Sequence, residues 1–371
     1  KKYLDKVKTL SLSPEAIQKE HDLKIVFTPL HGTTYELVPA SLRNWGFTNI
    51  HTVPEQSIPD GDFPTVASAN PEEPAAFKMA LDLARKIDAD LAMACDPDGD
   101  RIGIAVKNDA GEWTLLNGNQ TNIIFTEYII RRKKELNQLK GGEYTVKTIV
   151  TTELIKDIAE KNHIICYDVY TGFKWIADII RKEGGEKFIG GGEESFGYMP
   201  GAFTRDKDGV SATSLMAEIA AWVKMQNKTL YSFLKEIYAK YGFSQERMIY
   251  IVRKGLSGAQ EIKAMMEEFR HNTPKEINHS PVVLKKDYLS LEATNLQTGE
   301  KTHLDFETKS DVLQFFLADG SKISVRPSGT EPKIKFYFEA RTQMKDINDY
   351  ERAQQDANAR IDAIIKDLKL Q

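Results

Sequence analysis

The sequence predicts two tandem α/β layer domains followed by a smaller α+β domain. Strand-like apolar runs alternate with amphipathic helical patterns along the first two thirds of the chain, and this alternation stops near residue 242. A length of 371 residues also favours two or three domains, at about 150 residues each. We expect the domains at 1–140, 141–242 and 243–371.

The first domain shows the β-α-β-α-β order of a layered α/β sheet. A charged opening helix is followed by these expected strands and helices: strand Leu23–Phe27, helix Tyr35–Trp45, strand Ile50–Val53, helix Pro74–Lys86, and strands Leu91–Cys95 and Ile102–Val106. The stretch from Thr52 to Pro74 is rich in Pro, Asp, Asn and Gly, so we expect a long surface loop there. Loops of that length are usually functional or contact a partner.

The second domain repeats this pattern from about Gly142. Its expected elements are strand Thr148–Val150, helix Leu154–Lys161, strand Ile164–Val169, helix Lys174–Lys182, strand Lys187–Ile189 and helix Val210–Lys224. The third domain is expected to contain a strand near Phe243, a helix over Ala259–Arg270, several strands up to Phe338 and a last helix over Asp346–Lys369.

The composition excludes several classes of partner. A formal net charge of −4 and a pI near 6.1 argue against a nucleic-acid or anionic-membrane partner, because both need a basic face. No apolar run reaches the ~18 residues of a membrane span, and no signal-peptide pattern opens the sequence. Cys95 and Cys166 lie in apolar runs and are expected to be reduced core residues of a cytoplasmic protein.

The aspartate loop, D-P-D-G-D-R at residues 96–101, carries the strongest chemical signal. Asp96, Asp98 and Asp100 alternate between two apolar strands, and such close like charges repel strongly unless a hard divalent cation neutralises them. An EF-hand calcium loop is excluded because its sixth and twelfth positions would be Arg101 and Lys107. A solvated acidic turn remains the alternative. We expect Mg²⁺, with Arg101 facing a phosphoryl group.

A second loop, which we call the GEES loop, covers residues 190–198. Its glycines allow close approach of a ligand, while Glu193 and Ser195, two residues apart, suit the hydroxyls of a sugar. A flexible turn is the alternative interpretation, and a dinucleotide-binding fingerprint fits poorly because Ser195 stands where its last Gly belongs.

A third loop, R-P-S-G-T-E-P at residues 326–332, lies between two expected strands, and we call it the RPSGTEP loop. Arg326, Ser328, Gly329 and Thr330 offer a guanidinium, two hydroxyls and a backbone amide, which together favour phosphate binding. An ordinary hairpin turn is the alternative.

Two further positions at strand ends are ambiguous from the residues alone. Lys174 begins a helix and would ordinarily be a surface lysine, and His31 is better explained as a structural turn residue than as a catalyst.

Together the three loops indicate phosphosugar chemistry, and the chain resembles the α-D-phosphohexomutase superfamily of phosphoglucomutases and phosphomannomutases. The resemblance spans nearly all of the sequence and includes the D-x-D-x-D-R, G-E-E-S-F-G and R-P-S-G-T-E-P motifs in the family's order. L-N-G-N at 116–119 and D-K-D-G at 206–209 resemble the glucomutase and phosphopentomutase branch. Pro97 stands where many relatives have Gly, and Tyr198 where many mannomutases have His, and both weaken a mannomutase assignment more than a glucomutase one.

The resemblance implies a role for each motif residue. It implies the following: Mg²⁺ on Asp96, Asp98 and Asp100; Arg101 and Lys174 in catalysis; sugar hydroxyls on Glu193 and Ser195; and a non-reacting phosphate on Arg326, Ser328, Gly329 and Thr330. A bisphosphorylated sugar such as glucose 1,6-bisphosphate is the implied activator, and a phosphosugar the implied substrate.

Family members also carry a first domain whose phosphorylated serine, in a T-x-S-H-N-P-like loop, relays the phosphoryl group. The similar stretch at 67–73 lacks the Thr and His of that loop, so Ser68 is not assigned as the nucleophile. We therefore expect a mutase fragment that needs the N-terminal domain of its own polypeptide and is inactive without it. The alternatives are a phosphomannomutase, a phosphopentomutase or a non-catalytic phosphosugar-binding protein.

Overall fold

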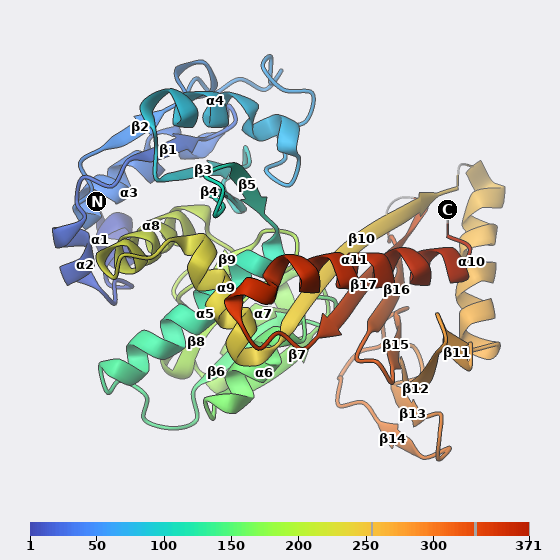
Figure 1. Ribbon diagram of the computed structural model, residues 1–371. Coiled ribbons are helices and arrows are strands. Elements are labelled where there is room, and N and C mark those ends of the chain that lie inside the picture. The colour runs from blue at the N-terminus through green and yellow to red at the C-terminus, as the bar shows by residue number, and fades with distance from the viewer. Residues whose placement is uncertain (254, 330–331, 371) are drawn as a thin grey trace. The chain divides into compact units, whose positions relative to one another are not determined.

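The computed structural model describes residues 1–253, 255–329 and 332–370. The chain forms two compact units, Lys1–Ile237 and Tyr238–Gln371. The first unit contains two α/β sheets and the second contains one antiparallel sheet with helices (Figure 1). This is the mixed fold class that the sequence predicts. No helix among the described residues has the length and apolar character needed to cross a lipid bilayer.

The first sheet of the first unit has the strand order β2-β1-β3-β4-β5. Strands β1, β2 and β3 are parallel, β4 runs antiparallel to β3, and β5 runs antiparallel to β4 and so has the direction of the first three. Small apolar residues on β3 pack against α4, which also contacts β1. The elements of this part are α1 (Lys2–Lys8), α2 (Pro14–Lys19), β1 (Ile25–Thr28), η1 (Thr33–Tyr35), α3 (Leu37–Trp45), β2 (Ile50–Thr52), η2 (Pro54–Gln56), η3 (Pro74–Phe77), α4 (Lys78–Ile87), β3 (Leu91–Cys95), β4 (Ile102–Lys107) and β5 (Trp113–Leu116).

The second sheet of this unit has the order β7-β6-β8-β9, with β6 parallel to both neighbours. Helix α7 packs on its strands, α5 contacts β8, and α8 contacts both α3 and β9. Helix α8 therefore joins the two layered parts of the unit (Figure 1). The elements are α5 (Gly118–Glu135), β6 (Tyr144–Thr148), α6 (Leu154–Lys161), β7 (Ile165–Val169), α7 (Phe173–Glu183), η4 (Gly185–Lys187), β8 (Phe188–Gly192), β9 (Tyr198–Met199), α8 (Gly209–Met225) and α9 (Leu230–Tyr241).

Two predictions for the second sheet and its loops were wrong, and one helix was not predicted. Strand β6 covers residues 144–148, so the expected strand at Thr148–Val150 begins where the real one ends, and Ile149 and Val150 lie in the following turn. The glycines at 190–192 continue strand β8 instead of forming a loop. The sequence interpretation also assigned no helix to 118–135, where α5 is found.

The second unit is built on an antiparallel sheet of order β10-β17-β16-β15-β12-β13-β14, with β11 paired to β12. Helix α10 brings Phe269 against Phe315 and Phe336, and α11 lies on β10 and β17. The elements are β10 (Phe243–Val252), α10 (Gly255–His271), β11 (Glu276–Ile277), β12 (Ser280–Asp287), β13 (Glu292–Asn295), β14 (Lys301–His303), β15 (Leu313–Leu317), β16 (Lys322–Pro327), β17 (Lys333–Thr342), η5 (Ile347–Asp349) and α11 (Tyr350–Asp367).

Candidate functional site

The aspartate loop connects β3 to β4 and brings its three carboxylates together. One oxygen from each of Asp96, Asp98 and Asp100 lies within 4.8 Å of the others. Asp96 is buried, Asp100 is half-buried and Asp98 is exposed, so the cluster opens toward solvent on one side. Carboxylate oxygens grouped in this way are the ligands that Mg²⁺ or Ca²⁺ prefers.

Local hydrogen bonds hold this loop in shape. One carboxylate oxygen of Asp96 accepts from the backbone N–H groups of Asp100 at 3.1 Å and Arg101 at 2.9 Å. Gly99 has a φ of +76°, a left-handed conformation that favours glycine. The carboxylates are therefore positioned by the turn itself.

The electrostatics of the cluster fit a bound cation. Burial, together with the neighbouring carboxylates of Asp100 and Asp98, raises the pKa of Asp96 to about 7. Atom Oδ1 of Asp100 is buried and has no hydrogen-bond partner among the described residues. A buried carboxylate oxygen without a donor is costly unless it has another ligand, and a divalent ion would supply that interaction for all three side chains.

Two basic side chains border the aspartate loop. Arg101 places Nε 3.4 Å from Asp96 and Nη1 3.2 Å from Glu72. Lys207 places Nζ 2.7 Å from Asp100. Burial alone would lower the pKa of Lys207, but its contact with Asp100 raises it, so this lysine is held as a cation. Neither Glu72 nor Lys207 was among the predicted site residues.

The GEES loop is hydrogen-bonded to the end of the aspartate loop. The N–H of Ile102 donates to the carbonyl oxygen of Phe196 at 3.0 Å, and Arg101 and Gly197 form an antiparallel bridge. The start of helix α5 packs closely against the GEES loop. A Cβ added at Gly118 would collide with the Glu194 carbonyl group, so only glycine allows this approach. The predicted metal and sugar residues are thus brought together within the first unit.

Within the GEES loop, Glu193 is buried and Ser195 is half-buried. A carboxylate oxygen of Glu193 accepts from the N–H of Gly172 at 2.6 Å, which fixes its direction. Burial and the adjacent Glu194 raise the pKa of Glu193. Lys174 is exposed near the start of α7, and its Nζ lies 5.0 Å from the ring centre of Trp175.

The described residues of the RPSGTEP loop lie at the end of β16 and the start of β17 in the second unit. The N–H of Ser328 donates to the carbonyl oxygen of Lys333 at 2.8 Å, with Arg326 and Ser328 half-buried and Gly329 exposed. Thr330, the remaining predicted ligand, lies outside the described residues. Arg326 is directly opposite Lys335 on β17, so both cations share one face of the sheet. Lys335 was not predicted.

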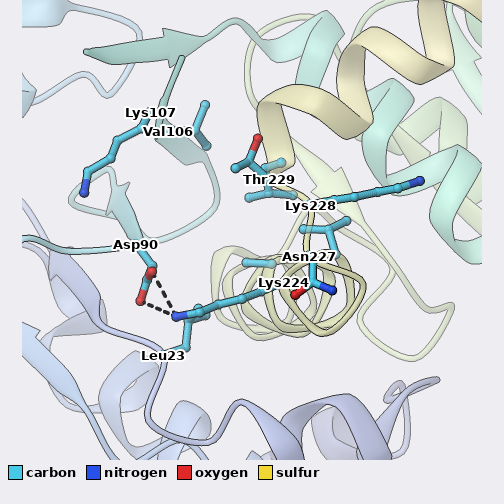
Figure 2. A pocket seen from close by; sticks show the side chains of 11 residues that line it. Leu23, Asp90, Val106, Lys107, Lys224, Asn227, Lys228 and Thr229 are labelled. Atoms are coloured by element: carbon cyan, nitrogen blue, oxygen red, sulfur yellow. Dashed lines mark hydrogen bonds and ion pairs between the residues drawn. The ribbon is translucent and has the colours of Figure 1, made fainter. Parts of the chain in front are cut away.

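A separate cavity of about 370 Å³ lies between the first sheet and α8. Figure 2 shows the side chains that line it. Three lysines line it, but each has an acidic partner: Lys107 pairs with Asp88, Lys224 with Asp90 and Lys228 with Glu236. Their charges are therefore already balanced. This cavity is a weaker candidate for a phosphorylated ligand than the three loops.

Comparisons with known proteins find similar sequences along most of the chain. Models for the phosphoglucomutase/phosphomannomutase family match the chain in three segments: α/β/α domain II at residues 1–111, α/β/α domain III at 117–241 and the C-terminal domain at 262–357. Phosphoglucomutases of Staphylococcus aureus strains MRSA252 and N315 are each 38% identical over 317 residues, which is 85% of this chain. The chain spans 56% of the length of these curated relatives.

Solved structures show the same fold. The open form of pp63/parafusin, a phosphoglucomutase from Paramecium, aligns with a TM-score of 0.66 and 17% identity, covering all of this chain and 60% of that protein. A phosphoglucomutase/phosphomannomutase family protein from Burkholderia thailandensis aligns with a TM-score of 0.60 and 16% identity, covering 91% and 61% respectively. At these identities the likeness concerns the fold alone.

Proposed function

Because the chain belongs to the phosphoglucomutase/phosphomannomutase family, we propose that it is the metal-, sugar- and phosphate-binding part of a phosphoglucomutase-like enzyme. The enzyme would interconvert a sugar 1-phosphate and the corresponding 6-phosphate. One observation carries the proposal: the carboxylate cluster, Arg101 and the GEES loop are joined by backbone hydrogen bonds in one unit.

Each loop has its own task in this proposal. Asp96, Asp98 and Asp100 would hold Mg²⁺, which when bound supplies charge neutralisation for a transferring phosphoryl group. Arg101 would contact the free oxygens of that group. Lys207 lies close enough to Asp100 to add a second positive charge at the same loop.

The sugar and phosphate contacts come from the other two loops. Glu193 and Ser195 would hydrogen-bond sugar hydroxyls, while Arg326, Ser328, Gly329 and Thr330 would bind the phosphate that does not react. Lys174 is proposed to assist proton transfer or charge stabilisation, although its ammonium faces Trp175 in this structure. Lys335, opposite Arg326, adds a second cation to the phosphate site.

A phosphoserine relay completes the proposed mechanism. The relay serine would lie on the family's first domain, outside this sequence, and a bisphosphorylated sugar such as glucose 1,6-bisphosphate would serve as intermediate and activator. None of the three matched models is that domain.

The test is an assay of this chain joined to a first domain, for example that of a Staphylococcus aureus phosphoglucomutase. We expect Mg²⁺-dependent conversion of glucose 1-phosphate to glucose 6-phosphate, faster than conversion of mannose 1-phosphate or ribose 1-phosphate. Preference for mannose or ribose would reassign the substrate. Phosphosugar binding without any turnover would favour a non-catalytic binding protein.

A further inference from the structure

A buried lysine lies beneath the GEES loop. Lys147 is fully buried on the central strand β6, one residue before the strand ends, and it faces Asp168 on β7 and Gly192 on β8 in the sheet register. The carboxyl ends of these three parallel strands meet at one edge of the sheet, where ligands of open α/β sheets bind. Its ammonium is therefore located under the loops that carry the proposed sugar contacts.

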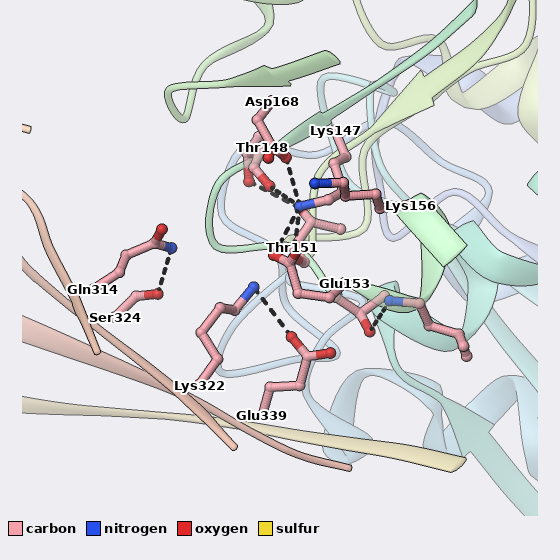
Figure 3. Close-up of polar contacts among 12 residues, drawn as sticks. Lys147, Thr148, Thr151, Glu153, Lys156, Asp168, Gln314, Lys322, Ser324 and Glu339 are labelled. Atoms are coloured by element: carbon pink, nitrogen blue, oxygen red, sulfur yellow. Dashed lines mark hydrogen bonds and ion pairs between the residues drawn. The ribbon is translucent and has the colours of Figure 1, made fainter. Parts of the chain in front are cut away.

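The ammonium is bound from several sides, as Figure 3 shows. Nζ lies 2.7 Å from Asp168 and 3.1 Å from Glu153, and 3.4 Å from the carbonyl oxygens of both Thr148 and Thr151. Burial alone would lower the pKa of Lys147, but Asp168 and Glu153 raise it well above its usual value. The lysine is charged, and it fixes the turn that contains both threonines.

The Thr148–Thr151 turn is hydrogen-bonded to the GEES loop. The hydroxyls of Thr148 and Thr151 lie 3.1 Å and 3.2 Å from the same carboxylate oxygen of Glu194, and the N–H of Glu194 donates to the Thr151 hydroxyl at 3.2 Å. Glu194 stands between Glu193 and Ser195, the two proposed sugar contacts. Any shift of the turn would therefore move both contacts.

We propose that Lys147 is a positioning residue for sugar recognition, which holds the Thr148–Thr151 turn and thereby the direction of Glu193 and Ser195. The inference rests on the proposed function of the GEES loop. Lys147 contacts no ligand in this scheme.

Amide hydrogen exchange tests the structural part without any ligand. In Lys147→Met we expect the amide of Glu194 to exchange about tenfold faster, whereas the central strands of the second unit stay protected. Lys156→Met is the matched control, because that lysine lies nearby on α6, is only half-buried and pairs with Glu160 at the long distance of 3.8 Å. Equal exchange at Glu194 in Lys147→Met and wild type would overturn the proposal.

Loss of the buried charge leaves two acidic partners uncompensated, so Lys147→Met could fail to fold. Thr151→Val keeps the ion pairs and removes one of the two hydroxyls that join the turn to Glu194, the one that also accepts from the Glu194 N–H. We expect this variant to reproduce the faster exchange. Wild-type exchange at Glu194 in a folded Thr151→Val chain would also contradict the proposed link.

Calorimetric titration tests the functional part on the same chain. We expect Thr151→Val to weaken binding of glucose 1-phosphate about tenfold, because small misplacements of contact groups are costly, while leaving the affinity for inorganic phosphate unchanged. Equal loss for both ligands would contradict a role in sugar positioning. If Glu193→Gln and wild type bind glucose 1-phosphate equally, the proposed function of the loop fails, and hydrogen exchange alone then decides the positioning role.

Discussion

At the scale of single residues, the aspartate loop is a site of unbalanced negative charge. Arg101 and Lys207 contact Asp96 and Asp100, yet Asp98 remains exposed and one oxygen of Asp100 has no donor within the described chain. The two basic side chains therefore offset only part of the repulsion. A divalent cation is the addition that would balance the remainder and order the exposed carboxylate.

Replacing Asp98 with Asn tests this balance. The amide keeps the shape of the side chain but removes one negative charge from the cluster, so we expect weaker Mg²⁺ binding, sharply reduced turnover in the complete enzyme and an unchanged fold. Turnover should be measured against Mg²⁺ concentration, with Asp62→Asn on the exposed loop as the control. Wild-type turnover of Asp98→Asn at limiting Mg²⁺ would disprove the metal assignment.

We expect the proposed phosphate site to depend most on Arg326. Replacement by Ala removes the bidentate donor of the loop and should cost about 1.5–3 kcal/mol of phosphosugar binding free energy. Replacement by Lys should recover only part of that loss, because an ammonium cannot form two parallel hydrogen bonds. Titration calorimetry gives both values, and an alanine variant with wild-type affinity would remove Arg326 from the site.

The sequence predicted acidic, glycine and hydroxyl residues of the candidate site more readily than its lysines. A D-x-D-x-D pattern has few explanations other than a cation, whereas a lysine is usually a surface residue. The importance of Lys207 is visible only from its contact with Asp100, which lies far from it in the sequence. That of Lys147 is visible only from its contact with Asp168 on another strand. Such pairings depend on sheet register and loop packing, which the local pattern does not contain.

At the scale of elements, helix α5 shows why a helix can escape sequence analysis. Thirteen consecutive residues from Gly118 to Ile130 are buried, so no polar face creates the 3.6-residue pattern of an amphipathic helix. The start of the helix did carry a signal. Asn117 and Gln120 form a capping box, in which each side chain accepts from the other residue's backbone N–H, at 2.8 Å and 3.0 Å.

This capping box should contribute measurably to stability. Asn117→Ala removes the acceptor for the Gln120 N–H, and we expect a loss of about 0.5–2 kcal/mol in the free energy of unfolding. Asn117→Asp keeps an acceptor and adds a charge that the helix N-terminus favours, so it should lose much less. Urea unfolding followed by circular dichroism compares the two. Equal destabilisation by both substitutions would mean that the cap is not the cause.

Strand β6 shows the opposite error, in which a strand was predicted where the structure has a turn. The Thr148–Val150 run is apolar enough to be predicted as a strand, but β6 ends at Thr148 and the next residues form the turn under the GEES loop. Hydrophobicity marks residues that become buried and does not distinguish a strand from a buried turn beside a site. The third domain was predicted only in outline, because short antiparallel strands carry little pattern each.

At the scale of the whole chain, the proposed work is divided between two compact units. The metal and sugar residues belong to the first, and the phosphate loop belongs to the second. In the proposed scheme each unit would supply groups that position or neutralise a phosphosugar. Neither supplies an identified nucleophile for the covalent step among the described residues, and Ser68, the one serine in a family-like N-P context, donates its hydroxyl to Glu73 at 2.9 Å on the surface.

Because of this division, we expect the chain alone to be inactive as a mutase. Phosphoryl transfer needs a nucleophile in line with phosphorus, so the purified 371-residue chain should fold and bind a phosphosugar yet show no mutase activity, even with added glucose 1,6-bisphosphate. A coupled assay for glucose 6-phosphate measures this, and addition of the family's first domain, fused or in trans, should restore turnover. Steady conversion of glucose 1-phosphate by the chain alone would show that it contains its own nucleophile. Loss of that activity in Ser68→Ala would then identify Ser68, and retention would exclude it.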